Sequence, residues 1–190
     1  MKGKLFIIAG PSGSGKDTII DAMCQKIPAL KKAISYTDRE KRLDDKADSY
    51  HFISKEIFDE LVKSGEVFEW EYARDERRYG SSKKEVMGHL AEGHNLIKIV
   101  GPKSFKNIKN IFGKQTTGIF IKYEGINLLK ERIKKNRPDI TERDLEVRFK
   151  QAFEDMGYEK DYDYSVINPE DHPEKAIGEV ERIIQNELKG

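Results

Sequence analysis

Gly10-Pro-Ser-Gly-Ser-Gly-Lys16 joins the apolar run 5–9 to a segment with helical periodicity that begins at residue 17. The glycines allow backbone N–H groups to turn inward around phosphate oxygens, and the helix start adds the positive end of its dipole. Lys16 can reach the β- and γ-phosphates as a mobile point charge. This order of strand, GxxxxGK loop and helix predicts a nucleotide-phosphate site. The residues expected to form it are Pro11, Ser12, Gly13, Ser14, Gly15, Lys16, Asp17 and Thr18.

Asp17 stands where the complete motif has a serine or threonine whose hydroxyl meets Mg²⁺, and Thr18 follows it. One interpretation is an acidic residue that the positive end of the helix dipole favours. The other is a carboxylate that holds Mg²⁺ between itself and the phosphate oxygens. Both residues are therefore candidate metal ligands, and the two interpretations of Asp17 stay open.

The chain has 190 residues with 35 basic and 34 acidic side chains, so its formal charge of +1 gives no general attraction for nucleic acid or anionic membranes. This length suits one compact core rather than two independent domains. No apolar run approaches the ~20 residues that span a bilayer, and no signal-peptide core precedes the first strand. The single cysteine, Cys24, cannot form an internal disulfide. We therefore expect a cytoplasmic monomer or small homo-oligomer without nucleic-acid or membrane partners.

Short apolar runs alternate with amphipathic stretches along the chain, which is typical of parallel strands linked by helices. The expected strands are 5–9, 33–36, 95–100, 118–122 and 164–167. The expected helices are 17–26, 54–64, 82–92, 103–111, 126–135, 142–156 and 172–188. Thr141 and Asp144 resemble a capping arrangement at the start of the helix 142–156. The fold class predicted from this pattern is α/β with a parallel sheet.

Two segments interrupt this alternation. Residues 37–81 concentrate charged and aromatic side chains around short strand-like pieces, as an inserted lobe that holds a phosphoryl acceptor would. Residues 130–148 are rich in arginine and contain a break between two helices at 136–139. Such a charged block is either a solvated helix face or a mobile flap. The four histidines show no ligand spacing; they are His51, His89, His94 and His172.

The segment Ser35-Tyr-Thr-Asp-Arg-Glu-Lys-Arg42 resembles the pattern Ser-x-Thr-Thr-Arg-x-x-Arg of the guanylate kinases, and Asp48-Ser-Tyr-His-Phe52 resembles the Tyr-x-Phe that follows it there. Phe68-Glu-Trp70 and Arg78-Tyr-Gly-Ser81 are similar to the segments that hold base and phosphate in that family. The resemblance runs along nearly the whole chain. It implies a three-layer P-loop NTPase core in residues 1–36, 82–125 and 150–190, a monophosphate-binding lobe in 37–81 and a lid in 126–149.

Arg39 and Arg42, three residues apart, can present forked donors to the dianionic phosphate of a nucleoside monophosphate. The hydroxyls of Tyr50 and Tyr79 can complete the hydrogen bonds of that phosphate. The alternatives are a surface ion pair for the arginines and ordinary packing for the tyrosines.

Glu69 is the candidate for recognition of the base. Guanine offers N1–H and N2–H₂ as neighbouring donors that one carboxylate can accept, whereas adenine offers an acceptor at N1. The alternative is a solvated strand residue. By resemblance, Ser35 and Ser81 bind the other side of the base.

Phosphoryl transfer needs alignment and charge neutralisation more than covalent chemistry, which points to Lys16, Mg²⁺ and arginines of the lid. The resemblance implies that these arginines are Arg132, Arg137 and Arg148, with one extra residue between the first two. It also places Asn168 near the adenine of ATP, and the alternative is a strand-terminal cap before Pro169.

In the family that this chain resembles, an Asp-x-Asp pair helps to position Mg²⁺ and the monophosphate. This chain departs from that pattern, since it has Lys98 and Val100 at the two positions.

The expected reaction is transfer of the ATP γ-phosphoryl group to GMP or dGMP. Two alternatives stay open. A ribose 1,5-bisphosphate phosphokinase has a similar loop without the acidic pair, and guanylate-kinase-like domains also serve as non-catalytic binding modules, which need neither Lys16 nor the arginines of the lid.

Overall fold

A five-stranded parallel sheet with the order β2-β7-β1-β8-β9 forms the centre of the molecule. The computed structural model describes residues 2–41, 50–72, 77–136 and 138–189. All five residues of the middle strand β1 are buried, which explains its continuous apolar sequence. The strands are β1 (Leu5–Ala9), β2 (Leu30–Lys32), β7 (Asn95–Ile99), β8 (Thr116–Lys122) and β9 (Tyr164–Ile167).

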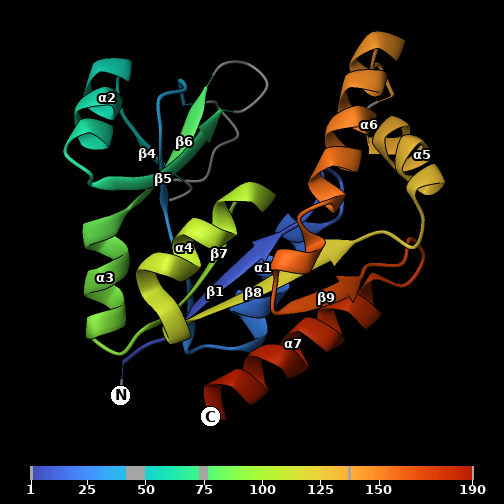
Figure 1. Ribbon diagram of the computed structural model, residues 1–190. Helices are drawn as coiled ribbons and strands as arrows, with labels where there is room; N and C mark the ends of the chain where they lie inside the picture. The colour runs from blue at the N-terminus through green and yellow to red at the C-terminus, as the bar shows by residue number, and fades with distance from the viewer. Residues whose placement is uncertain (1, 42–49, 73–76, 137, 190) are drawn as a thin grey trace.

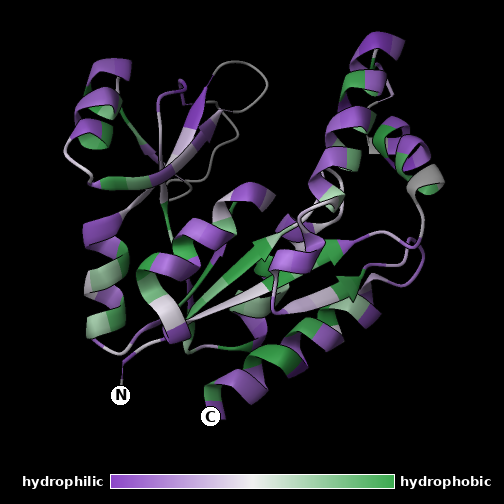
Figure 2. Cartoon of the chain, in the orientation of Figure 1, coloured by the Kyte–Doolittle hydropathy of each residue, from purple (hydrophilic) through white to green (hydrophobic). Residues whose placement is uncertain are grey.

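Helices cover both faces of this sheet and make the three layers predicted from the sequence (Figure 1). Because side chains alternate along a strand, Phe6 and Ile8 pack on one face, while Leu5 and Ile7 pack on the other. The first face is covered by α1 (Lys16–Lys26) and α7 (Pro173–Lys189), and the second by α3 (Lys83–Ala91) and α4 (Phe105–Phe112). Apolar residues accordingly gather on the central strands and the inner helix faces (Figure 2).

A second, four-stranded sheet with the order β4-β3-β6-β5 lies above one side of the core, next to α2 (Figure 1). Arg78 ties it to α2, since its guanidinium contacts Asp59 and donates to Asp38 at 2.6 Å and to the Lys55 carbonyl at 3.1 Å. The elements are β3 (Ser35–Thr37), β4 (Tyr50–Phe52), α2 (Lys55–Lys63), β5 (Val67–Tyr72) and β6 (Arg78–Ser82).

The strand expected at residues 33–36 is wrong as a core strand. The core strand is β2 (Leu30–Lys32), and Ser35–Thr37 crosses into the second sheet instead. β2 escaped detection because only Leu30 of its three residues is buried and two lysines follow it.

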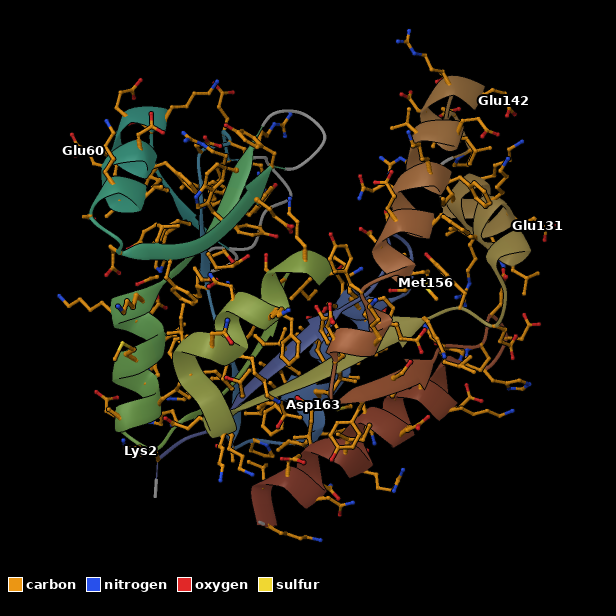
Figure 3. All side chains as sticks on the ribbon, in the orientation of Figure 1. Lys2, Glu60, Glu131, Glu142, Met156 and Asp163 are labelled. Carbon is orange, nitrogen blue, oxygen red and sulfur yellow. The ribbon has the colours of Figure 1, made fainter. Side chains whose placement is uncertain are left out.

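α5 (Ile126–Asn136) and α6 (Glu142–Met156) rise from the opposite side of the core. α6 runs from Glu142 at its outer end to Met156 near the core sheet (Figure 3). The predicted cap is confirmed, because the Thr141 hydroxyl accepts a hydrogen bond from the Asp144 N–H at 3.1 Å. Three short 3₁₀ turns also lie in the part of the chain that the structure describes: η1 (Pro102–Ser104), η2 (Gly113–Gln115) and η3 (Glu159–Asp161). Within the described residues, none of the helices has the length and apolarity to cross a membrane.

Candidate nucleotide site

The loop after β1 folds around its own lysine. The Lys16 ammonium donates to the carbonyls of Gly10 at 2.7 Å and Pro11 at 2.9 Å. Burial lowers the pKa of Lys16 to about 8, against the opposing effect of nearby carboxylates, of which Asp17 is the strongest. The loop carbonyls thus hold the ammonium group at the position where the sequence predicts the phosphates.

Asn168, at the end of β9, braces this loop. Its Nδ2 donates to the Ser14 carbonyl at 2.8 Å, and the Tyr123 hydroxyl donates to the Ser12 carbonyl from the other side. Gly15 has φ 86°, and a Cβ there would lie 2.4 Å from Asn168 Nδ2, so this position needs glycine. Two buried polar atoms, Ser14 Oγ and Asn168 Oδ1, have no hydrogen-bond partner within the described part of the chain. A bound nucleotide can supply partners for both.

Asp17 and Thr18 lie in the first turn of α1 and are exposed, directly after the lysine. Their carboxylate and hydroxyl oxygens are hard donors of the kind that Mg²⁺ takes together with phosphate oxygens and water. The residues present therefore fit a magnesium ion at this helix start.

The second sheet presents a row of polar side chains that its strand register makes neighbours. Ser35 pairs with Ser81 across β3 and β6, and Ser81 pairs with Glu69 across β6 and β5. Glu69 is only 7% exposed, and its carboxylate accepts a 2.7 Å hydrogen bond from the Ser81 hydroxyl. The structure therefore brings together the three residues that the sequence assigns to the base.

The residues assigned to the phosphate group lie beside this row. Arg39 is 6% exposed, its Nε donates to the Tyr79 hydroxyl at 3.1 Å, and its guanidinium lies 5.2 Å from the centre of the Tyr50 ring. The rings of Tyr50 and Tyr79 meet edge to face at 5.3 Å. These three side chains form one cluster, whereas Arg42 lies outside the described residues.

Lys98 reaches this site from the core sheet, which the sequence did not reveal. It is 4% exposed on β7, and its ammonium donates to the Ser35 hydroxyl at 2.5 Å. Burial lowers the pKa of Lys98, and the negative charge of Glu69 works against this shift. The lysine that replaces an acidic residue of the family pattern thus contacts Ser35, one of the residues assigned to the base.

Glu71 is a further acidic residue near this site, and no motif in the sequence contains it. It pairs in register with Tyr79, two residues along β5 from Glu69, and its carboxylate lies against Gly101, where a Cβ would be 1.7 Å from Oε2. Burial raises the pKa of Glu71 to about 7, and the Glu69 charge adds to this effect. The positive charges of Lys103 and, more weakly, Lys16 oppose this shift, so Glu71 lies within electrostatic reach of the phosphate loop. The one sequence feature that points to a role for Glu71 at this site is its two-residue spacing from Glu69.

The arginines assigned to the lid have different surroundings. The Arg132 Nη1 donates to the Asn168 carbonyl at 3.1 Å, and its Nε lies 3.6 Å from the Glu170 carboxylate, so this guanidinium already lies beside the braced loop. Arg148 is half-buried on α6. Arg137 lies outside the described residues.

Comparison with known proteins agrees with this geometry. The family model for guanylate kinase matches residues 2–187. The guanylate kinase of Clostridioides difficile is 35% identical over 187 residues, covering 98% of this chain and 89% of that protein. That of Coxiella burnetii is 34% identical, covering 98% and 88%. A crystal structure of guanylate kinase from Anaplasma phagocytophilum has a similar fold, with a TM-score of 0.76 at 21% identity over 98% of this chain and 86% of that one.

Proposed function

The chain belongs to the guanylate kinase family, and from this premise we propose that it transfers the γ-phosphoryl group of ATP to GMP or dGMP through the residues described above. The observation that carries this assignment is the position of Glu69 and Tyr79 on the second sheet, with Arg39, just after β3, bound to Tyr79. One carboxylate and one guanidinium are thereby positioned to take the base and the phosphate of the same acceptor.

Glu69 selects the base. Its carboxylate accepts from guanine N1–H and N2–H₂, whereas adenine N1 would leave this buried carboxylate without a donor. Arg39, with the hydroxyls of Tyr50 and Tyr79, holds the acceptor phosphate, because a guanidinium matches a phosphate with two parallel donors. The nucleoside monophosphate therefore binds along the second sheet, with its base at Glu69 and its phosphate at Arg39 and Tyr79.

Lys16 holds the triphosphate. On nucleotide binding its ammonium exchanges the carbonyls of Gly10 and Pro11 for phosphate oxygens, which compensate its buried charge better than carbonyls do. Asp17 and Thr18 would hold Mg²⁺, which neutralises charge on the phosphates when it is bound. Asn168 contributes its unpartnered Oδ1 on the side of the ATP base.

The transfer forms one bond and breaks one. An oxygen of the GMP phosphate attacks the γ-phosphorus, the bond from that phosphorus to the β–γ bridging oxygen breaks, and ADP leaves with the bond electrons. Arg132 and Arg148 supply positive charge to the transferring group, and residues 126–149 act as the lid that excludes water during this step. Residues 37–81 act as the lobe that carries the acceptor.

A competition between acceptors tests this proposal. The protein, ATP and Mg²⁺ are incubated with equal concentrations of GMP, AMP and ribose 1,5-bisphosphate, and the products are separated by anion-exchange chromatography. We expect GDP as the main product. Consumption of the sugar bisphosphate alone would favour the phosphokinase reaction, and no ATP-dependent product would favour a binding module. The cytoplasmic location, the oligomeric state and the absence of nucleic-acid partners stay predictions.

A further inference from the structure

Lys98 and Glu69 occupy opposite ends of a row of four polar side chains. Lys98 contacts Ser35, Ser35 pairs in register with Ser81, and the Ser81 hydroxyl contacts Glu69. Both charged residues are almost completely buried, at 4% and 7% exposure. The row therefore has a cationic end and an anionic end inside one site.

The two charges fix the direction of the serine hydroxyl protons, because each hydroxyl has a single proton to donate. Ser35 Oγ accepts from the Lys98 ammonium, so its own proton is available to a ligand. Ser81 Oγ donates its proton to Glu69, so only its lone pairs are available. The Lys98 end of the row thus offers donors, and the Glu69 end offers acceptors.

This polarity matches one purine edge and opposes the other. Guanine presents an acceptor at O6, followed by donors at N1 and N2, so O6 can face the Lys98 end while N1–H and N2–H₂ face Glu69. Adenine presents a donor at its 6-amino group, followed by an acceptor at N1. With adenine, donors would meet donors and acceptors would meet acceptors, which leaves buried groups unpaired.

We propose that Lys98 is a specificity-determining residue that selects guanine by directing donors, its own ammonium and the Ser35 hydroxyl, at O6. This inference rests on the proposed function. It assigns a task to the lysine that stands in place of the acidic pair, and it makes base selection a joint property of Lys98 and Glu69. The Glu69 carboxylate in turn offsets part of the cost of burying the ammonium group.

Steady-state kinetics with GMP, 6-thio-GMP and AMP tests the role of Lys98. 6-Thio-GMP keeps both donors that face Glu69 and replaces O6 by a weakly accepting sulfur. In Lys98→Met, which keeps the unbranched stem of the side chain but lacks the ammonium group, we expect kcat/KM for GMP to fall about 10- to 100-fold. The value for 6-thio-GMP should change less than about threefold, because that substrate gains little from the ammonium group.

Three controls separate this role from a structural one. Lys98→Arg keeps the charged donor and should retain the preference for GMP over 6-thio-GMP. Lys32→Met removes an exposed lysine of the neighbouring strand β2 and should behave as the unmodified protein. The KM for ATP should be the same in all variants, since Lys98 faces the acceptor.

Equal losses for GMP and 6-thio-GMP in Lys98→Met, or no loss for either, would overturn the inference. The inference would also be overturned if kcat/KM of the unmodified protein were the same for 6-thio-GMP as for GMP. This measurement does not depend on whether any variant folds. Absence of GMP turnover in the unmodified protein would instead refute the proposed function itself.

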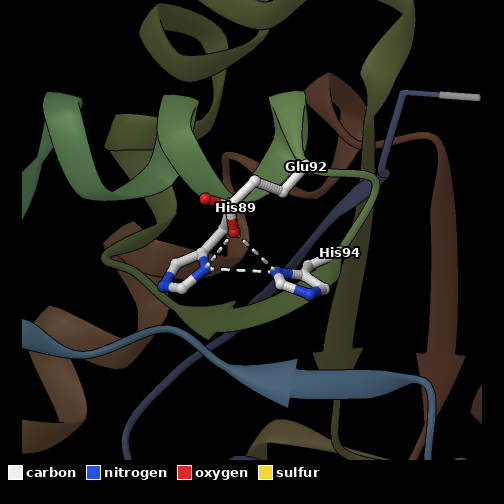
Figure 4. A group of neighbouring side chains, drawn as sticks. All are labelled: His89, Glu92 and His94. Atoms are coloured by element: carbon white, nitrogen blue, oxygen red, sulfur yellow. Dashed lines mark hydrogen bonds and ion pairs between the residues drawn. The ribbon is translucent and has the colours of Figure 1, made fainter.

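A second, independent observation concerns His89, Glu92 and His94, which lie together where α3 ends and β7 begins (Figure 4). The histidines show no ligand spacing along the sequence, and the fold brings these two into contact. Their Nδ1 atoms are 3.3 Å apart, and the Glu92 carboxylate oxygen lies 3.4 Å from His94 Nδ1 and 4.0 Å from His89 Nδ1.

These separations suit a shared tetrahedral metal ion. Zn–N bonds of about 2.0–2.1 Å at tetrahedral angles place two ligand nitrogens about 3.3–3.4 Å apart. The backbone fixes the turn, since the His94 N–H donates to the His89 carbonyl at 2.9 Å. The helix C-terminus adds the negative end of its dipole, which favours a cation.

We infer that this cluster binds Zn²⁺ through His89 Nδ1, His94 Nδ1 and a Glu92 carboxylate oxygen, with water at the fourth position. The rings are more than a third exposed, so the ion can enter from solvent. The site is a structural one that joins the end of α3 to the start of β7.

Zinc titration of the untagged, nucleotide-free protein, with a chromophoric chelator as competitor, tests this site. We expect one equivalent to bind, with an affinity at least 100-fold lower in the double variant His89→Ala, His94→Ala. His172→Ala and Cys24→Ser should bind as the unmodified protein does. Failure of the unmodified protein to take zinc from the chelator, unchanged affinity in the double variant, or loss of binding in Cys24→Ser would overturn the assignment.

Discussion

Replacing Glu71 by glutamine should change how the stability of the nucleotide-free protein depends on pH. Burial and the Glu69 charge raise the pKa of Glu71 from 4.5 to about 7, so the fold favours the protonated carboxyl. The resulting stability is fully present below pH 4.5 and is lost as the pH rises through 7. At pH values above both pKa values, ionised Glu71 lowers the free energy of unfolding by up to about 3 kcal/mol. Glutamine resembles the protonated carboxyl and has no such dependence.

Urea denaturation at several pH values, without nucleotide or Mg²⁺, measures the effect. The stability difference between Glu71→Gln and the unmodified protein should grow in favour of the variant by about 2 kcal/mol between pH 5.5 and pH 8. Glu131→Gln, at an exposed position of α5, is the matched control and should follow the unmodified protein. Parallel stability curves for Glu71→Gln and the unmodified protein, or a variant that becomes less stable than the unmodified protein toward pH 8, would show that the fold does not raise the pKa of Glu71.

Three further substitutions have distinct expected outcomes. Lys16→Ala should reduce transfer by at least about 100-fold with every acceptor, because it removes the charge that holds the triphosphate, and near-normal rates in a coupled ADP assay would contradict its role. Gly101→Ala should displace the Glu71 carboxylate, because an alanine Cβ would lie 1.7 Å from its Oε2, and should flatten the pH dependence described above, which the same urea series would detect. Asn168→Ala should raise the KM for ATP about tenfold while leaving the KM for GMP unchanged, because it removes the 2.8 Å bond to Ser14; an equal effect on both substrates would argue against its place beside ATP.

Elements with strong local signals were predictable from the sequence. The helix Glu142–Met156 has the predicted bounds because Thr141 caps its start and its apolar residues recur at helical spacing. The phosphate loop was equally clear, since its glycines and Lys16 act within one short segment. β2 was missed because three residues with two lysines carry no strand periodicity.

The base site needed information that local sequence does not hold. Ser35 and Glu69 become part of one row only through the register of β3, β6 and β5, and register depends on strand pairing across distant segments. The sequence showed that Lys98 replaces an expected acidic residue. Lys98 and Ser35 are 63 residues apart in the chain. Their contact follows from the packing of the second sheet against the core.

A crystal structure with GMP and a non-hydrolysable ATP analogue would show whether the two substrates meet as proposed. We predict the Watson–Crick edge of guanine within about 3 Å of the Glu69 carboxylate. The GMP phosphate should contact Arg39 and Tyr79 and point toward the γ-phosphate at Lys16. Guanine bound away from Glu69, or a GMP phosphate directed away from Lys16, would contradict the account.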